Sequence, residues 1–308
     1  MIAPPDEGTA AVPVAQHGAA AHALSVVVVR FAGGGAMEQT LDALRGQQGA
    51  AVEVLVVHRA GDGPSAAQRG RYPWVRWVDG GVAASPARLR AAGVRAAGGT
   101  IIACTEDHCV PAPDWCSRII ASHEGRSAVI GGAIDKSEPA SPLSWAAYLL
   151  DYGRYMPPLP AGPSPFASDC NVSYRRDDLA RVGEAWRDEF HETTVQWALE
   201  AIGVPTVLDP DIVVRQERAV QLTAWLAERR EHGRIFAGTR VAGASAPGRL
   251  RLIATALLLP PVILWRVRAG LRRRGAARRV PRETWGSLLK AAIAWSRGEL
   301  DGYWRGAR

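Results

Sequence analysis

The sequence has little lysine, few cysteines and no basic residue near its start. Only Lys136 and Lys290 of the 37 basic residues are lysine, a bias we assign to a GC-rich genome. The length of 308 residues excludes a disulfide scaffold, and the four cysteines lack the Cys-x-x-Cys spacing of zinc sites, which favours reduced thiols in a cytosolic protein. Because no Lys or Arg precedes Arg30, the Ala/Pro-rich start lacks the positive region of a secretion signal. We expect residues 1–23 to be a disordered leader.

Positive charge is also scarce in most of the chain. Residues 1–239 carry 22 basic and 27 acidic side chains, whereas residues 240–308 carry 15 basic and three acidic ones. The formal charge of +7 is therefore a mildly acidic body joined to a tail of +12. This distribution, without a recognition module, argues against nucleic acid as a partner.

The apolar pattern of the N-terminal third of the chain predicts an α/β fold. Leu24–Val29 and Val52–Val57 are continuous apolar runs, typical of strands buried on both faces of a parallel sheet. Met37–Leu44 between them is expected to be a helix, and Thr100–Cys104 follows as another strand. This alternation indicates a doubly wound, mostly parallel sheet that binds nucleotide.

An acidic triplet, Glu106, Asp107 and His108, follows the strand Thr100–Cys104. Ligands of open α/β sheets bind at the carboxyl ends of the strands, and one or two carboxylates commonly hold the divalent ion that bridges phosphates. The imidazole shifts the preference from Mg²⁺ toward Mn²⁺. We interpret the triplet as a metal and diphosphate site, with a solvated acidic turn as the alternative.

Several motifs in this order resemble the inverting glycosyltransferases of family 2, which have the GT-A fold. The similar segments are Ser25–Val29, Ala87–Leu89, Glu106–Trp115, Asp169–Arg176 and Val182–Trp186. The resemblance implies a GT-A domain, a nucleotide-sugar donor and a divalent cation, Mn²⁺ or Mg²⁺. It extends through most of the chain and does not depend on one motif.

The resemblance also implies a catalytic base. The family's base lies in an acidic segment that begins a helix, and the register of Phe190–Leu199 places Glu192 at that position. A carboxylate is needed because the acceptor hydroxyl must lose its proton as it attacks the anomeric carbon from the face opposite the leaving nucleotide. The alternative for Glu192 is a favourable interaction with the helix dipole.

Three further residues are implied as donor or acceptor contacts. Asp62 is the one acid near the end of the second strand, where the family grips the nucleoside. Arg88 is expected near the diphosphate, with a helix-surface ion pair as its alternative. Asn171 resembles the family's asparagine near sugar and acceptor, with the satisfaction of loop backbone as its alternative.

The sequence departs from the family at two places. His58 and Arg59 stand where consecutive acids are usual, and Gln216 takes the register of a metal-contacting histidine. These departures leave the nucleotide and the sugar undefined. They also motivate an alternative function, a catalytically weak GT-A scaffold that binds partner enzymes at the membrane.

The basic tail contains an apolar segment. Leu252–Trp265 is uncharged over 14 residues, shorter than the roughly 20 residues that a membrane span needs. Eight arginines follow in Arg266–Arg282. We expect residues 249–282 to lie on an anionic membrane surface, the alternatives being buried helical packing and nucleic-acid binding.

We therefore divide the chain into a leader (1–23), a GT-A nucleotide-sugar glycosyltransferase domain (24–239) and a basic, amphipathic helical appendage (240–308). The expected function is transfer of a sugar, with inversion, from a nucleotide-diphosphate donor to a hydroxyl of a lipid-linked saccharide or cell-envelope glycan. The expected location is cytoplasmic, peripheral on the inner face of the cytoplasmic membrane.

Overall fold

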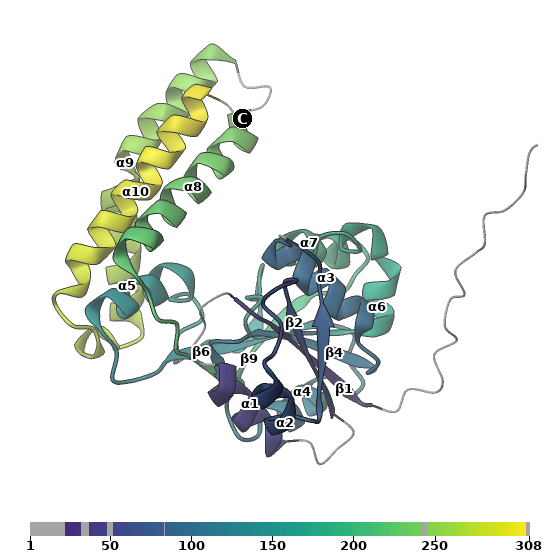
Figure 1. Cartoon of the computed structure of the whole chain (residues 1–308). Coiled ribbons are helices and arrows are strands. Elements are labelled where there is room, and N and C mark those ends of the chain that lie inside the picture. The colour runs from purple at the N-terminus through teal and green to yellow at the C-terminus, as the bar shows by residue number, and fades with distance from the viewer. Residues whose placement is uncertain (1–21, 32–36, 48–51, 83, 242–244, 306–308) are drawn as a thin grey trace, which may run out of the picture.

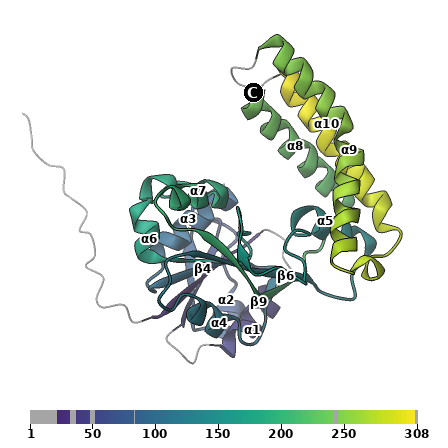
Figure 2. The same ribbon diagram turned by 180° about the vertical axis from the view of Figure 1, so that it is seen from behind.

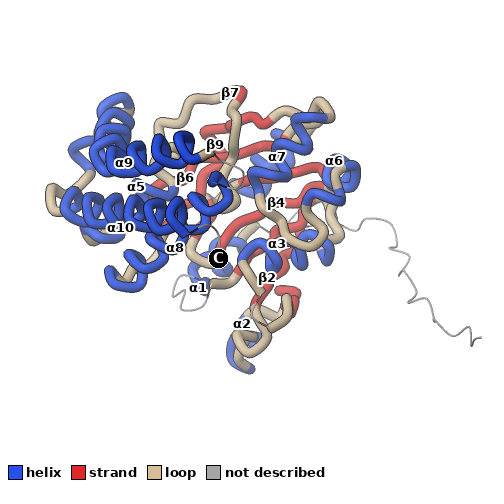
Figure 3. Tube along the Cα trace, turned by 90° about the horizontal axis from the view of Figure 1, so that it is seen from above, coloured by secondary structure: helices blue, strands red, loops and turns tan. Residues whose placement is uncertain are grey.

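The structure, a computed structural model, describes residues 22–31, 37–47, 52–82, 84–241 and 245–305. The expected leader, residues 1–23, lies almost wholly outside this described part. A sheet of nine strands forms the centre of the molecule, and a group of three long helices stands to one side of it (Figures 1 and 3).

The sheet has the order β3-β2-β1-β4-β8-β6-β9-β5, with β7 (Gly162–Pro163) paired to β9. Strands β1 (Leu24–Val29), β2 (Val52–His58), β3 (Val75–Asp79) and β4 (Ile101–Glu106) are all parallel. This part confirms the predicted doubly wound half. The sheet is mainly parallel, and antiparallel pairings begin at β8.

The second half of the sheet is formed by β5 (Cys109–Pro111), β6 (Val129–Lys136), β8 (Val172–Arg175) and β9 (Thr206–Gln216). Strand β8 runs antiparallel to both β4 and β6, whereas β6 and β9 are parallel. A register shift at Gly132/Ala133 interrupts the β6–β9 pairing. The fold is thus an α/β architecture in which β8 reverses direction in the middle of the sheet.

The continuous apolar strands are buried on both faces, as their composition predicts. In β1, Val26 and Val28 contribute to the core under α1 (Met37–Arg45) and α4 (Trp115–Ser122), and Val27 and Val29 to the core under α3 (Pro86–Ala96). This alternation follows from the two-residue repeat of a strand. Helices α6 (Arg176–Arg181) and α7 (Glu192–Ala201) join α3, and α2 (Ala66–Arg71) lies near α1 (Figures 1 and 2).

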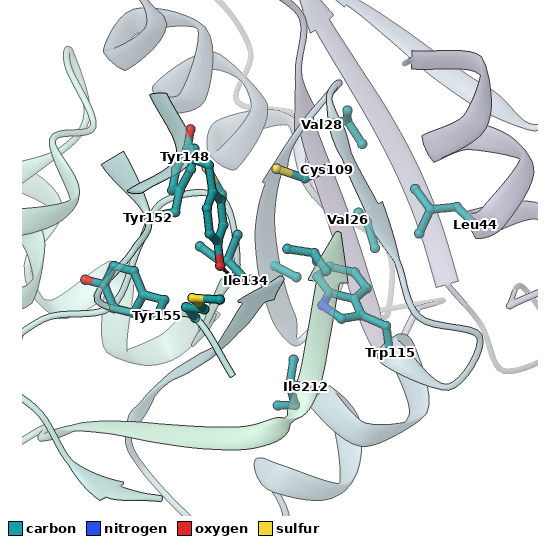
Figure 4. Packing of buried hydrophobic residues seen from close by; sticks show 14 of the residues in the cluster. Val26, Val28, Leu44, Cys109, Trp115, Ile134, Tyr148, Tyr152, Tyr155 and Ile212 are labelled. Atoms are coloured by element: carbon teal, nitrogen blue, oxygen red, sulfur yellow. Dashed lines mark hydrogen bonds between the residues drawn. The ribbon is translucent and has the colours of Figure 1, made fainter. Parts of the chain in front are cut away.

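An aromatic cluster links the sheet to the long helices. Helix α5 (Pro142–Asp151) and the loop after it bring Tyr148, Tyr152 and Tyr155 beside Ile134 of β6 (Figure 4). Tyr148 is fully buried and its hydroxyl donates to the backbone oxygen of Ile134 at 2.7 Å. The cluster holds α5 against the sheet, and the long helices pack against α5.

The helical appendage comprises α8 (Leu222–Val241), α9 (Ala246–Arg273) and α10 (Thr284–Arg305). Helix α10 packs closely on α8, since a Cβ at Gly298 would meet the backbone oxygen of Arg230. The expected boundary at residue 240 therefore differs from the structure: it falls in the last turn of α8, and the helical unit begins at Leu222. The boundary was placed where the charge of the chain changes, and α8 carries charges of both signs. Its packing partner α10 lies far later in the chain, so the sequence did not show that the two belong together.

Helix α9 is longer than the expected apolar segment. It continues through Pro260 and Pro261, and Pro247–Arg273 is a stretch of 27 residues whose most apolar 18-residue window has a mean hydropathy of 1.7 and is only 6% buried. By length and composition this helix suffices to cross a membrane, so the expectation that the segment is too short was wrong. Part of the basic charge is used internally, because Arg274 and Arg279 bind the backbone or acids of the sheet domain.

Candidate active site

The acidic triplet lies at the carboxyl edge of the parallel strands. Glu106 is the last residue of β4 and pairs in register with Val29 at the end of β1. Asp107 and His108 form the turn into β5, where the backbone N–H of Phe31 donates to Oδ2 of Asp107 at 2.9 Å. The structure therefore places all three side chains where the strand pattern predicts, and fixes Asp107 against the neighbouring strand end.

The three side chains are buried together. Nε2 of His108 lies 3.3 Å from Oε2 of Glu106, and Nδ1 lies 3.4 Å from Oδ1 of Asp107. Burial, and then the charge of Asp169, raises the pKa of Glu106. Burial alone would lower the pKa of His108, but Cys109, Asp107 and Glu106 together raise it to about 9. The raised pKa of His108 in spite of its burial shows that negative groups surround it, so this edge of the sheet favours a cation.

A buried arginine lies on the other side of Glu106. Nη2 of Arg90, on α3, is 2.6 Å from Oδ2 of Asp169 and 3.4 Å from Oε1 of Glu106. The side chain of Arg90 is only 3% exposed. Burial alone would lower its pKa, yet Asp169 and Glu106 raise it above the ordinary value. Arg90 thus remains charged and orients two carboxylates of the site.

Glu192 begins α7 and faces the same cleft. The loop before it is tied to α3, because the N–H of Phe190 donates to the backbone oxygen of Ala87 at 2.9 Å. Burial, and then the charge of Asp169, raises the pKa of Glu192, while Arg90 opposes the shift. A carboxylate that is held at the edge of a cleft with a raised pKa is suited to accept a proton.

A cleft of about 970 Å³ joins these groups. Its walls include Glu106, Asp107, His108, Asp169 and Glu192. The sequence therefore identified four of these five side chains, although Glu192 lies far from the acidic triplet along the chain. The cleft is large enough for a nucleotide with a sugar attached.

Three residues predicted to bind donor or acceptor are placed elsewhere. The amide of Asn171 is buried and accepts from Trp115 Nε1 at 2.8 Å while donating to the backbone oxygens of Ala133 and Ile212. Its hydrogen-bonding groups are used within the protein, so the backbone-satisfying alternative is the one that the structure has. The reason is that Asn171 directly precedes β8 in the middle of the sheet, where buried backbone carbonyl groups need hydrogen-bond donors.

Arg88 also lies outside the cleft walls. Its side chain is 64% exposed and its Nε lies 2.9 Å from Oε1 of Glu189, which is the helix-surface ion pair. Asp62 is half-buried in the turn after β2 and is absent from the described walls of the cleft. In its place Arg59 reaches the wall, with its Nε donating to the backbone oxygen of Ala84 at 2.8 Å.

Two sets of ligands are available for a metal ion. One is the predicted set of Glu106, Asp107 and His108. The other joins Glu106 to Cys109 and Cys170, whose ligand atoms all lie within 4.8 Å of one another. The second set was missed because its two thiols are widely separated in the sequence and form no short cysteine motif.

Gln216 borders this region from β9. It pairs in register with Cys109, it is fully buried, and both amide atoms lack a hydrogen-bond partner among the described residues. Directly opposite residues of an antiparallel pair share a face, so the amide lies on the side of Cys109. Buried polar atoms without a partner are rare, and the pair of carboxylates, the imidazole and this amide fit a divalent cation.

Comparison with known proteins agrees with this geometry. A family model described as "Glycosyl transferase family 2" matches residues 25–183, more than half of the chain. The chain belongs to glycosyl transferase family 2. The match covers β1 through α6 and ends before Glu192 and Gln216.

A solved structure agrees with the GT-A fold of this family 2 glycosyltransferase. A mannosyltransferase from Pyrobaculum calidifontis, solved with GDP-Man and Mn²⁺, has a TM-score of 0.53 and 17% identity over 90% of this chain and 87% of that one. TarS 1–349 from S. aureus is also similar, with a TM-score of 0.46 and 13% identity, covering 72% and 66%. No protein with curated annotation matches the chain.

Two further residues of this site were missed by sequence reasoning, Arg90 and Asp169. Asp169 opens the segment Asp169–Arg176, which the family resemblance had singled out as a whole. Arg90 gave no signal, because an arginine on a helix is ordinarily solvated. Only the packing of α3 against the sheet turns its side chain inward.

Proposed function

We propose that this glycosyltransferase transfers a sugar, with inversion, from a nucleotide-diphosphate donor to the hydroxyl of a lipid-linked saccharide or cell-envelope glycan. One observation carries the proposal: Glu106, Asp107, His108 and Glu192 line a single cleft at the carboxyl edge of the parallel strands. A cation-binding corner and a separate carboxylate with a raised pKa are the two parts that such a displacement needs.

Glu106, Asp107 and His108 would hold a divalent cation, Mn²⁺ or Mg²⁺. When bound, the cation neutralises the diphosphate and so stabilises the leaving group. The imidazole of His108 makes Mn²⁺ a better match than Mg²⁺, and the thiols of Cys109 and Cys170 lie beside Glu106. Arg90 holds Glu106 and Asp169 in position from the opposite side.

Glu192 would act as the general base. The acceptor oxygen forms a bond to the anomeric carbon as the bond from that carbon to the diphosphate oxygen breaks, and the hydroxyl proton passes to the Glu192 carboxylate. The nucleoside diphosphate leaves with the bonding electron pair, so one displacement inverts the anomeric centre. Its raised pKa makes Glu192 a stronger base than a solvated glutamate.

The test compares Glu192→Gln with Glu189→Gln. Glu189 lies three residues earlier, is exposed, and binds Arg88 and His191. The assay follows radiolabelled sugar from a panel of nucleotide donors into a lipid extract, together with the slow transfer of the same sugar to water. Loss of a general base lowers the rate by about 10²–10⁴-fold, and we expect this for Glu192→Gln alone.

Binding of a nucleoside diphosphate, measured by calorimetry with Mn²⁺ present, should be unchanged in both variants. This measurement shows that the cleft remains folded. If Glu192→Gln transferred sugar as fast as the parent at saturating donor, Glu192 would not be the base.

We further propose that the enzyme works at the inner face of the cytoplasmic membrane, held there peripherally by residues 249–282. The support is α9, a helix rich in arginine on which Leu257, Leu258 and Trp265 are 62%, 62% and 67% exposed. Flotation with anionic vesicles should capture the protein, and Leu257→Gln/Leu258→Gln should release it. Carbonate at high pH should extract a peripheral protein, whereas resistance to extraction would mean that α9 spans the bilayer.

One observation favours the second candidate, a weakly active scaffold. Gln216 stands at the register where the family resemblance implies a metal-contacting histidine, and an amide is a weaker metal ligand than an imidazole. Calorimetry with a panel of nucleoside diphosphates and Mn²⁺ separates the two functions. A scaffold binds none of them, whereas the enzyme binds at least one.

A further inference from the structure

A second cavity, of about 810 Å³, lies beside the catalytic cleft. It is lined by residues of α5, the loop after it and the three helices α8, α9 and α10. Figure 1 shows α5 at the foot of these long helices. Five side chains line both spaces: Leu150, Asp151, Arg154, Arg229 and Trp295. The two cavities therefore share one wall, and a long ligand can occupy both.

The second cavity is strongly basic. Its walls contain one carboxylate and five guanidinium groups, from Arg154, Arg229, Arg266, Arg273 and Arg274. The carboxylate, Asp151, is already bound, with its Oδ1 lying 2.7 Å from Nη1 of Arg229. Among the described residues, Arg266 and Arg273 have no acidic partner and no hydrogen bond. Their charge is thus available to an anion.

The rest of the cavity wall is apolar, with Met156 after α5 and Ile263, Val267 and Leu271 on α9. The same helix exposes Leu258, Val262 and Trp265 on the outside of the molecule. A purely inorganic anion does not need these apolar walls, and a purely apolar ligand does not need the arginines. Together they match an amphiphile with a phosphate head and a hydrocarbon chain.

We propose that the second cavity binds the phosphate or diphosphate group and the adjoining hydrocarbon of a lipid-linked acceptor. The arginines hold the phosphate, the chain follows the apolar side of α9 toward the lipid, and the saccharide extends through the shared wall toward Glu192. The inference rests on the proposed function and defines its acceptor as a lipid phosphate.

The experiment measures binding of radiolabelled farnesyl phosphate to the full-length protein in neutral detergent micelles. Arg266→Gln/Arg273→Gln removes two charges from the cavity wall, and Arg268→Gln/Arg272→Gln removes two exposed charges from the same helix outside it. The two double variants therefore have the same net charge. Farnesol and inorganic phosphate serve as competitors that lack, respectively, the phosphate and the chain.

We expect the cavity variant to bind farnesyl phosphate at least about tenfold more weakly and the control within about twofold of the parent. Neither farnesol nor inorganic phosphate should compete at concentrations where farnesyl phosphate saturates. Equal losses in both variants, or no loss in either, would overturn the proposal. Full competition by inorganic phosphate would also overturn it, because the site would then be one for a free anion.

Failure of this inference is distinguishable from failure of the proposed function. Calorimetry of nucleoside diphosphate with Mn²⁺ reports on the first cavity alone. If the parent binds a nucleoside diphosphate but no farnesyl phosphate, only the lipid-phosphate site is wrong. If it binds no nucleoside diphosphate, the proposed enzyme function is wrong.

Discussion

Arg90 provides a sharp test of how the site is held together. Its guanidinium is 3% exposed and lies 2.6 Å from Asp169 and 3.4 Å from Glu106. In Arg90→Met the volume is nearly kept, but the two carboxylates lose their shared partner in a poorly solvated place. Breaking a buried pair by removing one partner costs about 3–5 kcal/mol of unfolding free energy.

Arg88→Met is the matched control. Arg88 is two residues away on the same helix, yet it is 64% exposed and its partner Glu189 is 39% exposed. An exposed pair of this kind contributes little to stability. Urea unfolding of both variants, followed by tryptophan fluorescence, should therefore show a large loss for Arg90→Met and almost none for Arg88→Met.

Adding Asp169→Asn to Arg90→Met removes one of the two uncompensated carboxylates. The double variant should recover at least about 1 kcal/mol relative to Arg90→Met, because interacting sites are not additive. If Arg90→Met unfolded within about 1 kcal/mol of the parent, or if both arginine variants lost equal stability, the buried network would not have the role that its geometry implies.

Three other predictions concern pH and metal. The base must be ionised, and burial raises the pKa of Glu192 above its ordinary 4.5. As the pH is lowered, kcat/KM should therefore decrease with an apparent pKa above 4.5. A decrease with an apparent pKa at or below 4.5 would contradict this. Burial, followed by the charge of Arg175, lowers the pKa of His123 from 6.5 to about 4, so the unfolded state takes up this proton first and stability is lost as pH falls from 6.5 toward 4. Between pH 7 and 5 the parent should lose about 2 kcal/mol more than His123→Gln in urea unfolding, and equal losses would refute the assignment. EDTA should abolish sugar transfer, and added Mn²⁺ should restore it in the parent and in Cys109→Ser/Cys170→Ser but not in His108→Ala. If Mn²⁺ failed to restore transfer in the cysteine variant instead, the ion would lie on the side of the two thiols.

The local pattern was sufficient for the elements of the first half of the sheet. Leu24–Val29 is a strand with the predicted bounds, and the helix expected at Met37–Leu44 ends one residue later than predicted, at Arg45. These segments have a continuous apolar run or clear start and stop residues, so neighbouring residues alone fix their conformation. The length of β9 depends instead on another element, because its pairing with β6 continues across an irregularity.

The same distinction applies to the site. Glu106, Asp107 and His108 were found because a polar triplet directly after an apolar strand is a local signal. Glu192 was found because aligning its segment with the family's acidic motif places it at the position of the base. Asn171 was assigned to the sugar, but its amide satisfies buried backbone of β6 and β9. Sequence does not show which backbone groups a side chain will meet across a sheet.

The sequence by itself determined the α/β class, the family resemblance, the acidic corner and the separation of a basic tail from an acidic body, because each depends on residues close together in the chain. Only the tertiary structure decided that Arg90 is buried between two carboxylates, that Cys109 and Cys170 adjoin Glu106, and that α8 belongs with α9 and α10. These facts arise from contacts between different elements of the fold that are well separated in the sequence. Such contacts are selected by the packing of the whole chain, and no short stretch of residues encodes them.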